Sequence, residues 1–224
     1  MSSIAIDGPA GAGKSSIAKA LSKRLGYIYI DTGAMYRAVA LFFVENNVSD
    51  GTDSRIESLL EKLEISIKYE DGAQKVILNG EDVTGKLRLE EIGKLASKFS
   101  AIGSVREKLV ALQRKLAQKE NVVMDGRDIA TTVLPNADVK IFLTAKPHTR
   151  ALRRYKELLE KGMEADINDI EADIIKRDER DMNREISPLR QATDAYVVDS
   201  SDKDLDDTLT EILFYVKRKF DERS

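Results

Sequence analysis

The segment IAIDGPAGAGKSSIAKAL, residues 4–21, decides how this chain begins to fold. Ile4 to Ile6 predict a short buried strand, and Lys14 to Leu25 predict a helix that ends at Gly26. Between them, residues 8–15 match the pattern G-x-x-x-x-G-K-[ST]. Glycines let the backbone turn sharply and approach an anion, and the N–H groups at the start of the helix face it. The segment therefore predicts a loop that binds phosphate groups, and the alternative is a glycine-rich turn without a ligand.

Particular side chains of this loop have expected roles. Lys14 would supply positive charge to the β- and γ-phosphate oxygens, and the Ser15 hydroxyl would hold Mg²⁺. Asp125 ends a predicted strand and would lie at the same sheet edge, where it could orient water on the metal; the alternative is an aspartate that only caps a turn. We therefore expect ATP and Mg²⁺ here, with ATP contacted by Gly8, Pro9, Ala10, Gly11, Ala12, Gly13, Lys14, Ser15 and Ser16.

The order of predicted elements indicates the fold class. A second strand at Tyr27 to Ile30 and a second helix at Gly33 to Val44 follow the first pair. Alternating strands and helices are typical of a parallel sheet covered by helices, so we expect an α/β protein with the three-layer phosphate-loop NTPase fold. Later strands are predicted at 122–124, 139–143 and 196–198, and later helices at 104–120, 147–161, 167–186 and 205–220.

The middle of the chain departs from this alternation. Residues 65–69 and 76–78 alternate between apolar and polar side chains, and Asp71-Gly72 and Asn79-Gly80 are turn signals beside them. A small antiparallel patch is therefore predicted. We place an insertion with antiparallel strands at about 60–100, between core segments 1–59 and 101–224, and a helical lid at about 150–186.

Composition limits the classes of partner. The chain has 224 residues, 42% of them hydrophobic, a net charge of −3 and no cysteine. This length suits one domain with an insertion, and the lack of cysteine excludes disulfides and thiolate metal sites. The charge gives no general attraction to nucleic acid or membranes, and the apolar stretch Ala38 to Val44 falls far short of the ~20 residues that span a bilayer. We expect a cytoplasmic monomer that acts on small molecules.

Arginines in the two late helices are spaced so that they repel each other. Arg150 and Arg154 lie four residues apart, as do Arg180 and Arg184, and Arg177 falls on the same stripe as the second pair. Like charges at this spacing destabilise a helix by a few tenths of a kcal/mol. Guanidinium groups bind phosphate oxygens in a planar fork. The pattern favours a lid that closes over phosphates and excludes water.

An alternative interpretation of these helices is an ordinary solvated surface. In that case Arg153–Glu157 and Arg177–Asp181 would form ion pairs within each helix. The only histidine, His148, follows a proline at a predicted helix start, and we expect it on the surface.

Four segments in this order resemble the bacterial cytidylate kinases: GPAGAGKS at 8–15, DTGAMYR at 31–37, DGRD at 125–128 and RDERDMNR at 177–184. The resemblance runs from about residue 2 to residue 218. It implies transfer of the γ-phosphoryl group of ATP to CMP, and also to dCMP, and a catalytic set of Lys14, Arg127, Arg154 and Arg177. The middle insertion also looks like the enlarged nucleotide-binding insertion of that family.

The same resemblance implies the residues of the acceptor site. Thr32 and Asp181 correspond to residues near the sugar, and Ser97, Arg106 and Asp128 to residues that read cytosine; Arg37, Arg127 and Arg184 correspond to contacts of the acceptor phosphate. Arg154 and Arg177 look like the arginines of the lid. A cytosine edge presents one amino donor and two acceptors, which suits an arginine fork combined with a carboxylate or hydroxyl.

Three other functions remain open from the residues. A related phosphate-loop kinase could act on shikimate, a coenzyme precursor or another nucleotide. A nucleotide-dependent switch would usually read guanine with an Asn-Lys-x-Asp segment, which this sequence lacks. An ATPase that binds nucleic acid is disfavoured by the acidic balance of charge.

Overall fold

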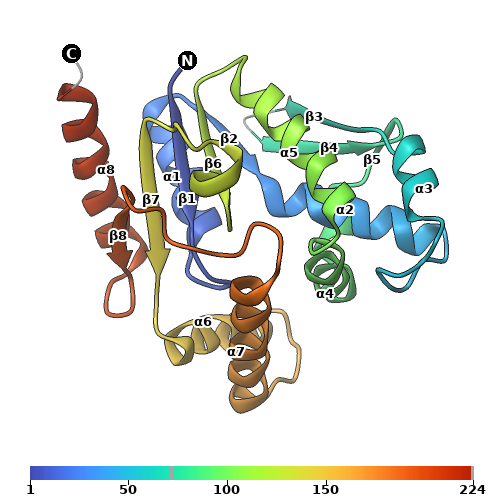
Figure 1. Cartoon of the computed structure of the whole chain (residues 1–224). Helices are drawn as coiled ribbons and strands as arrows, with labels where there is room; N and C mark the ends of the chain where they lie inside the picture. The colour runs from blue at the N-terminus through green and yellow to red at the C-terminus, as the bar shows by residue number, and fades with distance from the viewer. Residues whose placement is uncertain (71–72, 223–224) are drawn as a thin grey trace. The chain divides into compact units, whose positions relative to one another are not determined.

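The computed structural model describes residues 1–70 and 73–222. The chain divides into two compact units: one comprises Met1–Tyr29 and the chain from Lys119 onward, the other Ile30–Gln118 (Figure 1). The insertion predicted at 60–100 lies inside the second unit, and its bounds as a nucleotide-binding domain stay a prediction.

A parallel sheet organises the first unit, and its strand β2 runs on into the first residues of the second. Its five strands, in the order β2-β6-β1-β7-β8, are β2 Ile28–Asp31, β6 Val122–Gly126, β1 Ser3–Asp7, β7 Val139–Thr144 and β8 Tyr196–Asp199. β1 pairs in parallel with both β6 and β7, and β7 pairs in parallel with β8. Asp7 stands opposite Gly126 in this register. The predicted parallel sheet is confirmed, and its carboxyl edge holds the ends of β1 and β6 side by side.

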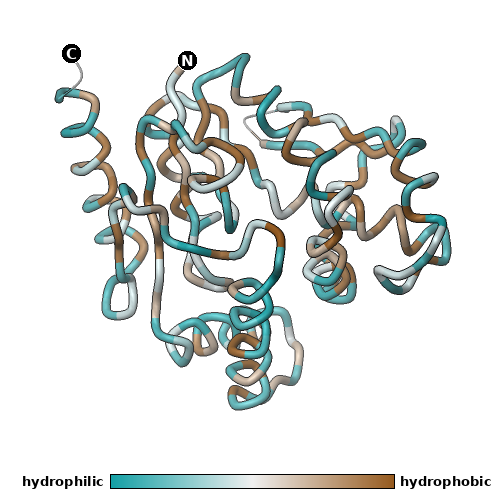
Figure 2. Tube along the Cα trace, in the orientation of Figure 1, coloured by the Kyte–Doolittle hydropathy of each residue, from teal (hydrophilic) through white to brown (hydrophobic). Residues whose placement is uncertain are grey.

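The helices of this unit follow the predicted positions closely. They are α1 Lys14–Leu25, α6 Pro147–Glu160, α7 Ile167–Asn183 and α8 Leu205–Asp221. The core forms where α1 and α8 pack on the sheet: Ile6 of β1, Leu21 of α1 and Val216 of α8 belong to one buried cluster. Both helices have one apolar side, and hydrophobic and hydrophilic positions alternate along α8 in Figure 2. Gly26 ends α1, as predicted, and its backbone has the left-handed conformation.

One element of this unit was not predicted. Residues Ile129–Val133, directly after the DGRD segment, form a short π-helical turn called η2. Its amides bond unusually far back along the chain, with the Val133 N–H donating to the Asp128 carbonyl oxygen at 3.1 Å. Single π-helical turns often occur at functional sites.

The second unit joins helices to a small sheet. Its elements are α2 Thr32–Glu45, α3 Ile56–Lys62, β3 Ile65–Glu70, β4 Ala73–Leu78, β5 Glu81–Asp82, the 3₁₀ turn η1 Lys86–Arg88, α4 Glu90–Phe99 and α5 Gly103–Ala117. The strands form an antiparallel sheet in the order β3-β4-β5, as the alternating pattern predicted. The turn predicted at Asp71-Gly72 lies outside the described residues, whereas the turn at Asn79-Gly80 is present. The short helices α3 and α4 were not predicted.

Together the parallel sheet, its flanking helices and the antiparallel sheet confirm the predicted α/β fold class. In the part of the chain that is described, no helix combines the length and the apolar character needed to cross a bilayer.

Candidate active site

The phosphate loop has a backbone that requires glycine at two positions. Gly8 has φ 148°, and a Cβ there would lie 1.9 Å from the Leu143 carbonyl oxygen of β7. Gly13 has φ 90° and is the N-cap of α1, where no side chain caps the helix and the first turn contains no acidic residue. The N–H groups that begin α1 are therefore left for an anion. The predicted strand, loop and helix are all present.

Lys14 lies against this loop with only 6% of its surface exposed. Its Nζ donates a hydrogen bond to the Pro9 carbonyl oxygen at 2.7 Å. Burial, and next the positive charge of Arg127, lower the pKa of Lys14 to about 7, although Asp125 and Asp7 act in the opposite direction. A triphosphate beside Lys14 would supply the negative charge that stabilises its protonated form.

Three side chains with oxygen atoms meet next to Lys14. The Ser15 hydroxyl donates to Asp125 Oδ2 at 2.8 Å, and the Tyr29 hydroxyl donates to Asp125 Oδ1 at 3.0 Å. Hydroxyl and carboxylate oxygens are the ligands that Mg²⁺ prefers, and Mg²⁺ usually keeps several waters and phosphate oxygens as its other ligands. The described residues contain no cluster of three or more His, Cys, Asp or Glu that could hold a metal alone. The pair Ser15 and Asp125 therefore fits a magnesium ion that arrives with a nucleotide.

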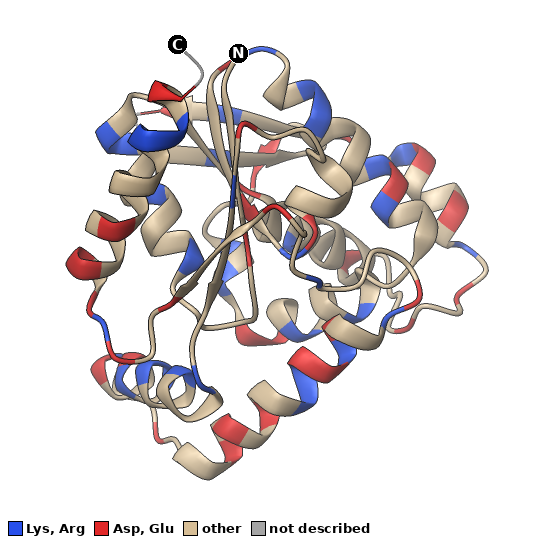
Figure 3. Cartoon of the chain, turned by 60° about the vertical axis from the view of Figure 1, so that its left-hand side comes forward, with Lys and Arg blue, Asp and Glu red and all other residues tan. Residues whose placement is uncertain are grey.

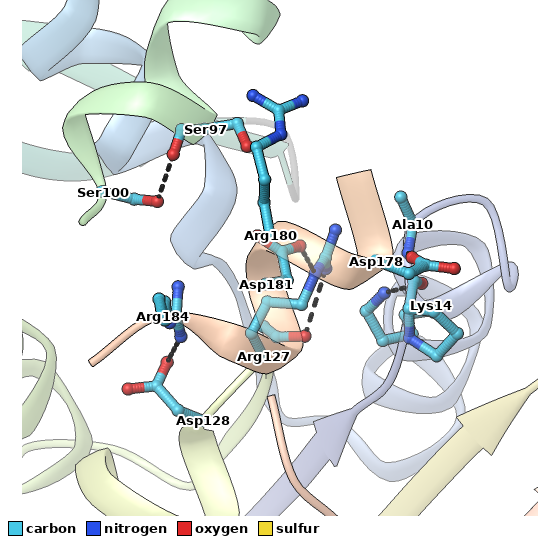
Figure 4. Close-up of polar contacts among 12 residues, drawn as sticks. Ala10, Lys14, Ser97, Ser100, Arg127, Asp128, Asp178, Arg180, Asp181 and Arg184 are labelled. Atoms are coloured by element: carbon cyan, nitrogen blue, oxygen red, sulfur yellow. Dashed lines mark hydrogen bonds and ion pairs between the residues drawn. The ribbon is translucent and has the colours of Figure 1, made fainter. Parts of the chain in front are cut away.

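Two ion pairs connect the DGRD segment with α7 and the residue that follows it (Figure 4). Arg127 Nε donates to Asp181 Oδ2 at 2.9 Å, and Arg184 Nη2 lies 3.6 Å from Asp128 Oδ1. Burial alone would raise the pKa of the Asp181 carboxyl, but Arg127, Arg177 and Arg184 outweigh it and the pKa is lowered. The structure thus brings together four of the predicted acceptor-site residues, two of each charge.

The lid arginines differ in their surroundings. Arg150 is only 3% exposed and donates to the carbonyl oxygens of Ala145 at 2.8 Å and Ala10 at 2.9 Å. It also forms an ion pair of 2.7 Å with Asp178. The expectation that Arg150 faces an anionic guest is therefore wrong, because protein groups already satisfy its guanidinium. Arg154 is more exposed and contacts Glu157 at 3.2 Å.

The solvated-surface interpretation of these helices is not supported by the contacts. Arg153 does not pair with Glu157; it donates instead to the Ser200 carbonyl oxygen at 2.6 Å. Asp181 accepts from Arg127 of the DGRD segment at 2.9 Å, and Arg177 of its own helix also acts on its carboxyl electrostatically. Figure 3 shows both acidic and basic residues on the helix pair at its bottom. His148 is on the surface as expected, and its Nδ1 lies 2.8 Å from Glu171 Oε2.

In the second unit, the DTGAMYR segment begins α2. Asp31 caps this helix by accepting from the Ala34 N–H at 2.8 Å, and it also accepts from Arg37 Nη2 at 3.0 Å. Gln74 of β4 holds the backbone of Asp31 from the other side: it accepts from the Asp31 N–H at 2.9 Å and donates to its carbonyl oxygen at 3.3 Å. Thr32 is buried as the first residue of α2. Arg37 and Thr32 are therefore held at one helix terminus.

Arg106 of α5 is buried in the same unit, with 2% of its surface exposed. Its Nη1 donates to the Ser100 carbonyl oxygen at 3.1 Å, and its guanidinium lies 5.6 Å from the centre of the Tyr36 ring. A buried charged side chain needs several partners. The Ser100 carbonyl oxygen and the Tyr36 ring fix the plane of the Arg106 guanidinium. Ser97 lies one turn before Ser100, and its buried Oγ has no hydrogen-bond partner among the residues described.

Sequence reasoning missed four side chains that hold the site together: Asp7, Tyr29, Gln74 and Asp178. Asp7 lies between the predicted strand and the glycine loop and had no expected role, and Asp178 appeared only within the RDERDMNR segment. Tyr29 and Gln74 act from strands, and their partners are distant in sequence by 96 and 43 residues respectively. No local pattern marks such contacts. A buried carboxylate directly before the phosphate loop was the one available signal.

The sheet order, the glycine loop at the start of α1 and the lysine inside it define a phosphate-loop kinase. The cytidylate kinase family model matches residues 4–218. Among curated relatives, a cytidylate kinase from Carboxydothermus hydrogenoformans is 50% identical, with 97% of this chain and 98% of the relative covered. One from Caldicellulosiruptor bescii is 52% identical, with 94% and 93% covered. The chain belongs to the cytidylate kinase family.

Solved structures support the fold alone. A shikimate kinase from Bacteroides thetaiotaomicron aligns with a TM-score of 0.52 at 14% identity, covering 96% of this chain and 98% of its own. An uncharacterised protein from Eubacterium ventriosum aligns with a TM-score of 0.55 at 15% identity, covering 97% and 99%.

Proposed function

We propose that this protein transfers the γ-phosphoryl group of ATP to CMP, and also to dCMP, giving ADP and CDP or dCDP. It is an ATP-dependent nucleoside monophosphate kinase, a phosphotransferase whose acceptor is itself a phosphate group. The observation that carries the proposal is the match to cytidylate kinases over nearly the whole chain. The phosphate loop supplies the physical reason, because its conformation leaves backbone N–H groups for the donor phosphates.

At the donor site, residues 8–16 surround the phosphates of ATP. Lys14 holds positive charge against the β- and γ-phosphate oxygens, where charge develops as the phosphoryl group moves. Ser15 would hold Mg²⁺, with Asp125 acting through water. When bound, this ion neutralises charge on the β- and γ-phosphates. Asp125 also orients the Ser15 hydroxyl, which donates a hydrogen bond of 2.8 Å to Asp125 Oδ2.

At the acceptor site, arginines hold the phosphate of CMP. Arg37, Arg127 and Arg184 are assigned to this phosphate, and each already shares its guanidinium with an aspartate: Asp31, Asp181 and Asp128. These carboxylates keep the forks oriented before the nucleotide arrives, which reduces the entropy lost on binding. Asp181 has a lowered pKa and stays ionised at neutral pH, so it can also accept from a ribose hydroxyl. Thr32 is assigned to the sugar as well.

Cytosine is read by Arg106, Asp128 and Ser97. Arg106 is suited to this because the Ser100 carbonyl oxygen and the Tyr36 ring fix its orientation. The buried Ser97 Oγ offers a further polar group for the base. Reading a base by hydrogen bonds rejects analogues strongly, because a wrong base leaves buried polar groups unsatisfied.

Arg154 and Arg177 complete the transfer step from α6 and α7. Arg154 is partly exposed and forms an exposed ion pair with Glu157, so it can turn to a phosphate at little cost. Arginine charge on the transferred group stabilises the transition state, and closed helices exclude water that would otherwise hydrolyse ATP. We further propose that the protein works as a cytoplasmic monomer without a nucleic-acid or membrane partner, in keeping with its small molecules as substrates and its net charge of −3.

A panel of acceptors tests the function. ADP release from ATP and Mg²⁺ would be measured with CMP, dCMP, UMP, AMP and GMP, and with shikimate as a non-nucleotide acceptor. The proposal expects the highest kcat/KM with CMP, followed by dCMP. Preference for a purine nucleotide or for shikimate would contradict it.

A further inference from the structure

Asp7 occupies the junction between two motifs of the first unit. It is the last residue of β1 and directly precedes Gly8, the first residue of the phosphate loop. It is only 1% exposed. Its carboxylate spans to the segment that follows β6: Oδ1 accepts from the Ile129 N–H at 2.8 Å, and Oδ2 accepts from the Ala130 N–H at 2.7 Å.

These two amides begin the η2 turn, immediately after Asp128. No side chain of the turn's own N-cap residue bonds them. A buried carboxylate is costly unless it is hydrogen-bonded, and here each oxygen serves a different backbone donor. An asparagine of the same shape has only one acceptor oxygen, and its NH₂ group would face an N–H. The site therefore requires an ionised carboxylate rather than any polar side chain.

We infer that Asp7 is a positioning residue of the kinase, which fixes Arg127 and Asp128 relative to the phosphate loop. The inference rests on the proposed roles of those two residues at the acceptor site. It follows from connectivity: Asp7 is covalently joined to Gly8, and through Ile129 it holds the residue next to Asp128. A shift of this turn would displace the acceptor-site side chains while leaving the glycine loop intact.

The charge of Asp7 gives the interaction a pH dependence. Two charged groups act on its carboxyl: Asp128, which raises its pKa, and Lys14, which lowers it. Burial is the largest influence and, against the two amide hydrogen bonds, raises the pKa of Asp7 to about 6. Below that pH one oxygen carries a proton and loses part of its capacity to accept. Positioning of the turn should therefore weaken as the pH falls through 6.

The test compares Asp7→Asn with Asp138→Asn. Asp138 is a matched control because its Oδ2 also accepts from a backbone amide, that of Ser3 at 2.7 Å, but at the opposite end of β1. For Asp7→Asn we expect kcat/KM for CMP to fall at least tenfold and KM for CMP to rise, with KM for ATP within threefold of wild type. Asp138→Asn should keep the wild-type kcat/KM for CMP. The pH dependence of kcat/KM for CMP is a second readout. Titration of the substrates affects all three proteins alike. Wild type and Asp138→Asn should lose activity as the pH falls through 6, and Asp7→Asn should lack this loss.

Asp7→Glu covers the case in which Asp7→Asn does not fold. It keeps both acceptor oxygens but moves them by one methylene, so KM for CMP should again rise more than KM for ATP. Equal losses for both substrates, or an unchanged KM for CMP, would mean that Asp7 has a purely structural role and overturn the inference. If wild type fails to phosphorylate CMP at all, the proposed function fails instead, so the two failures are distinguishable.

Discussion

Arg150 Nη1 lies 2.7 Å from Asp178 Oδ2, and this buried ion pair joins α6 and α7 to the phosphate loop. Both partners contact the same loop residue: Arg150 donates to the Ala10 carbonyl oxygen at 2.9 Å, and the Ala10 N–H donates to Asp178 at 3.4 Å. α7 also carries Arg177, which directly precedes Asp178, and Asp181, which lies about one turn after it. The pair therefore sets the distance between the loop and the helix that we assign to the transfer step.

Removing one partner of this pair should destabilise the protein strongly. We expect Asp178→Ala to lower the free energy of unfolding by ~3–5 kcal/mol, because it leaves the Arg150 charge buried without its partner. The double variant Arg150→Met with Asp178→Leu should recover much of the loss. Urea unfolding of the three proteins measures this, with Glu157→Ala as the control, since the exposed Arg154–Glu157 pair should contribute little. A double variant that is no more stable than Asp178→Ala would contradict the coupling of the two residues.

Lys14 should matter for turnover and not for folding. Its buried ammonium already has a lowered pKa, so Lys14→Ala removes a charge that the folded protein accommodates at some cost. We expect a melting temperature at or slightly above that of wild type, and a loss of kcat by two or more orders of magnitude, at ~1.4 kcal/mol of barrier per tenfold. Calorimetry and ADP release provide both numbers. Nearly full activity in Lys14→Ala would contradict the role of the phosphate loop.

Binding of ATP should take up protons near pH 8. In the protein without ATP, Lys14 has a pKa of about 7, so its side chain is mostly neutral at pH 8. The negative triphosphate raises that pKa toward its ordinary value, and the ammonium then gains a proton. Titration calorimetry in two buffers of different ionisation enthalpy measures the uptake at a pH above the titration of the ATP phosphates. We expect net uptake in wild type that is absent in Lys14→Met; equal uptake in both proteins would assign the proton to another group.

The choice of cytosine should depend on Arg106 and Asp128. UMP presents a carbonyl where CMP has an amino group, and its N3 carries a proton, so a carboxylate and an arginine fork would each meet a like partner. Leaving such buried groups unsatisfied costs ~1–3 kcal/mol or more. We expect kcat/KM for CMP to exceed that for UMP at least tenfold in wild type.

Arg106→Met and Asp128→Ala should reduce this preference mainly by harming CMP. Ser97→Ala serves as a milder variant, because it removes a single hydroxyl. The ratio of kcat/KM for the two nucleotides is compared across the four proteins. A ratio that stays constant in both Arg106→Met and Asp128→Ala would place base recognition elsewhere.

The fold could be predicted from sequence where one residue pattern determines one element. Lys14–Leu25 was predicted to the residue, because a glycine stands at each end and the apolar side chains share a face. The helices α3 and α4 were missed, since each is short and lies among polar residues beside the small sheet. The η2 turn could not be predicted because its first amides are capped by Asp7, a residue 122 positions away.

The candidate site shows the same division. The phosphate loop is a contiguous pattern and could be read directly. Arg150 looked like an anion-binding residue because its charge conflicts with Arg154 along the helix, but its partner Asp178 comes from the next helix and resolves the conflict. The residues that orient others, such as Gln74 and Tyr29, carry no local signature, because their roles depend on which strands become neighbours.

The fate of the γ-phosphoryl group tests the central claim most directly. ATP labelled in its γ-phosphate would be incubated with CMP, Mg²⁺ and the protein, and the products separated and counted. The account predicts that the label appears in CDP, with one ADP formed for each CDP, and that Lys14→Ala makes both products at least a hundred times more slowly. Label recovered as inorganic phosphate while CMP stays unchanged would contradict it.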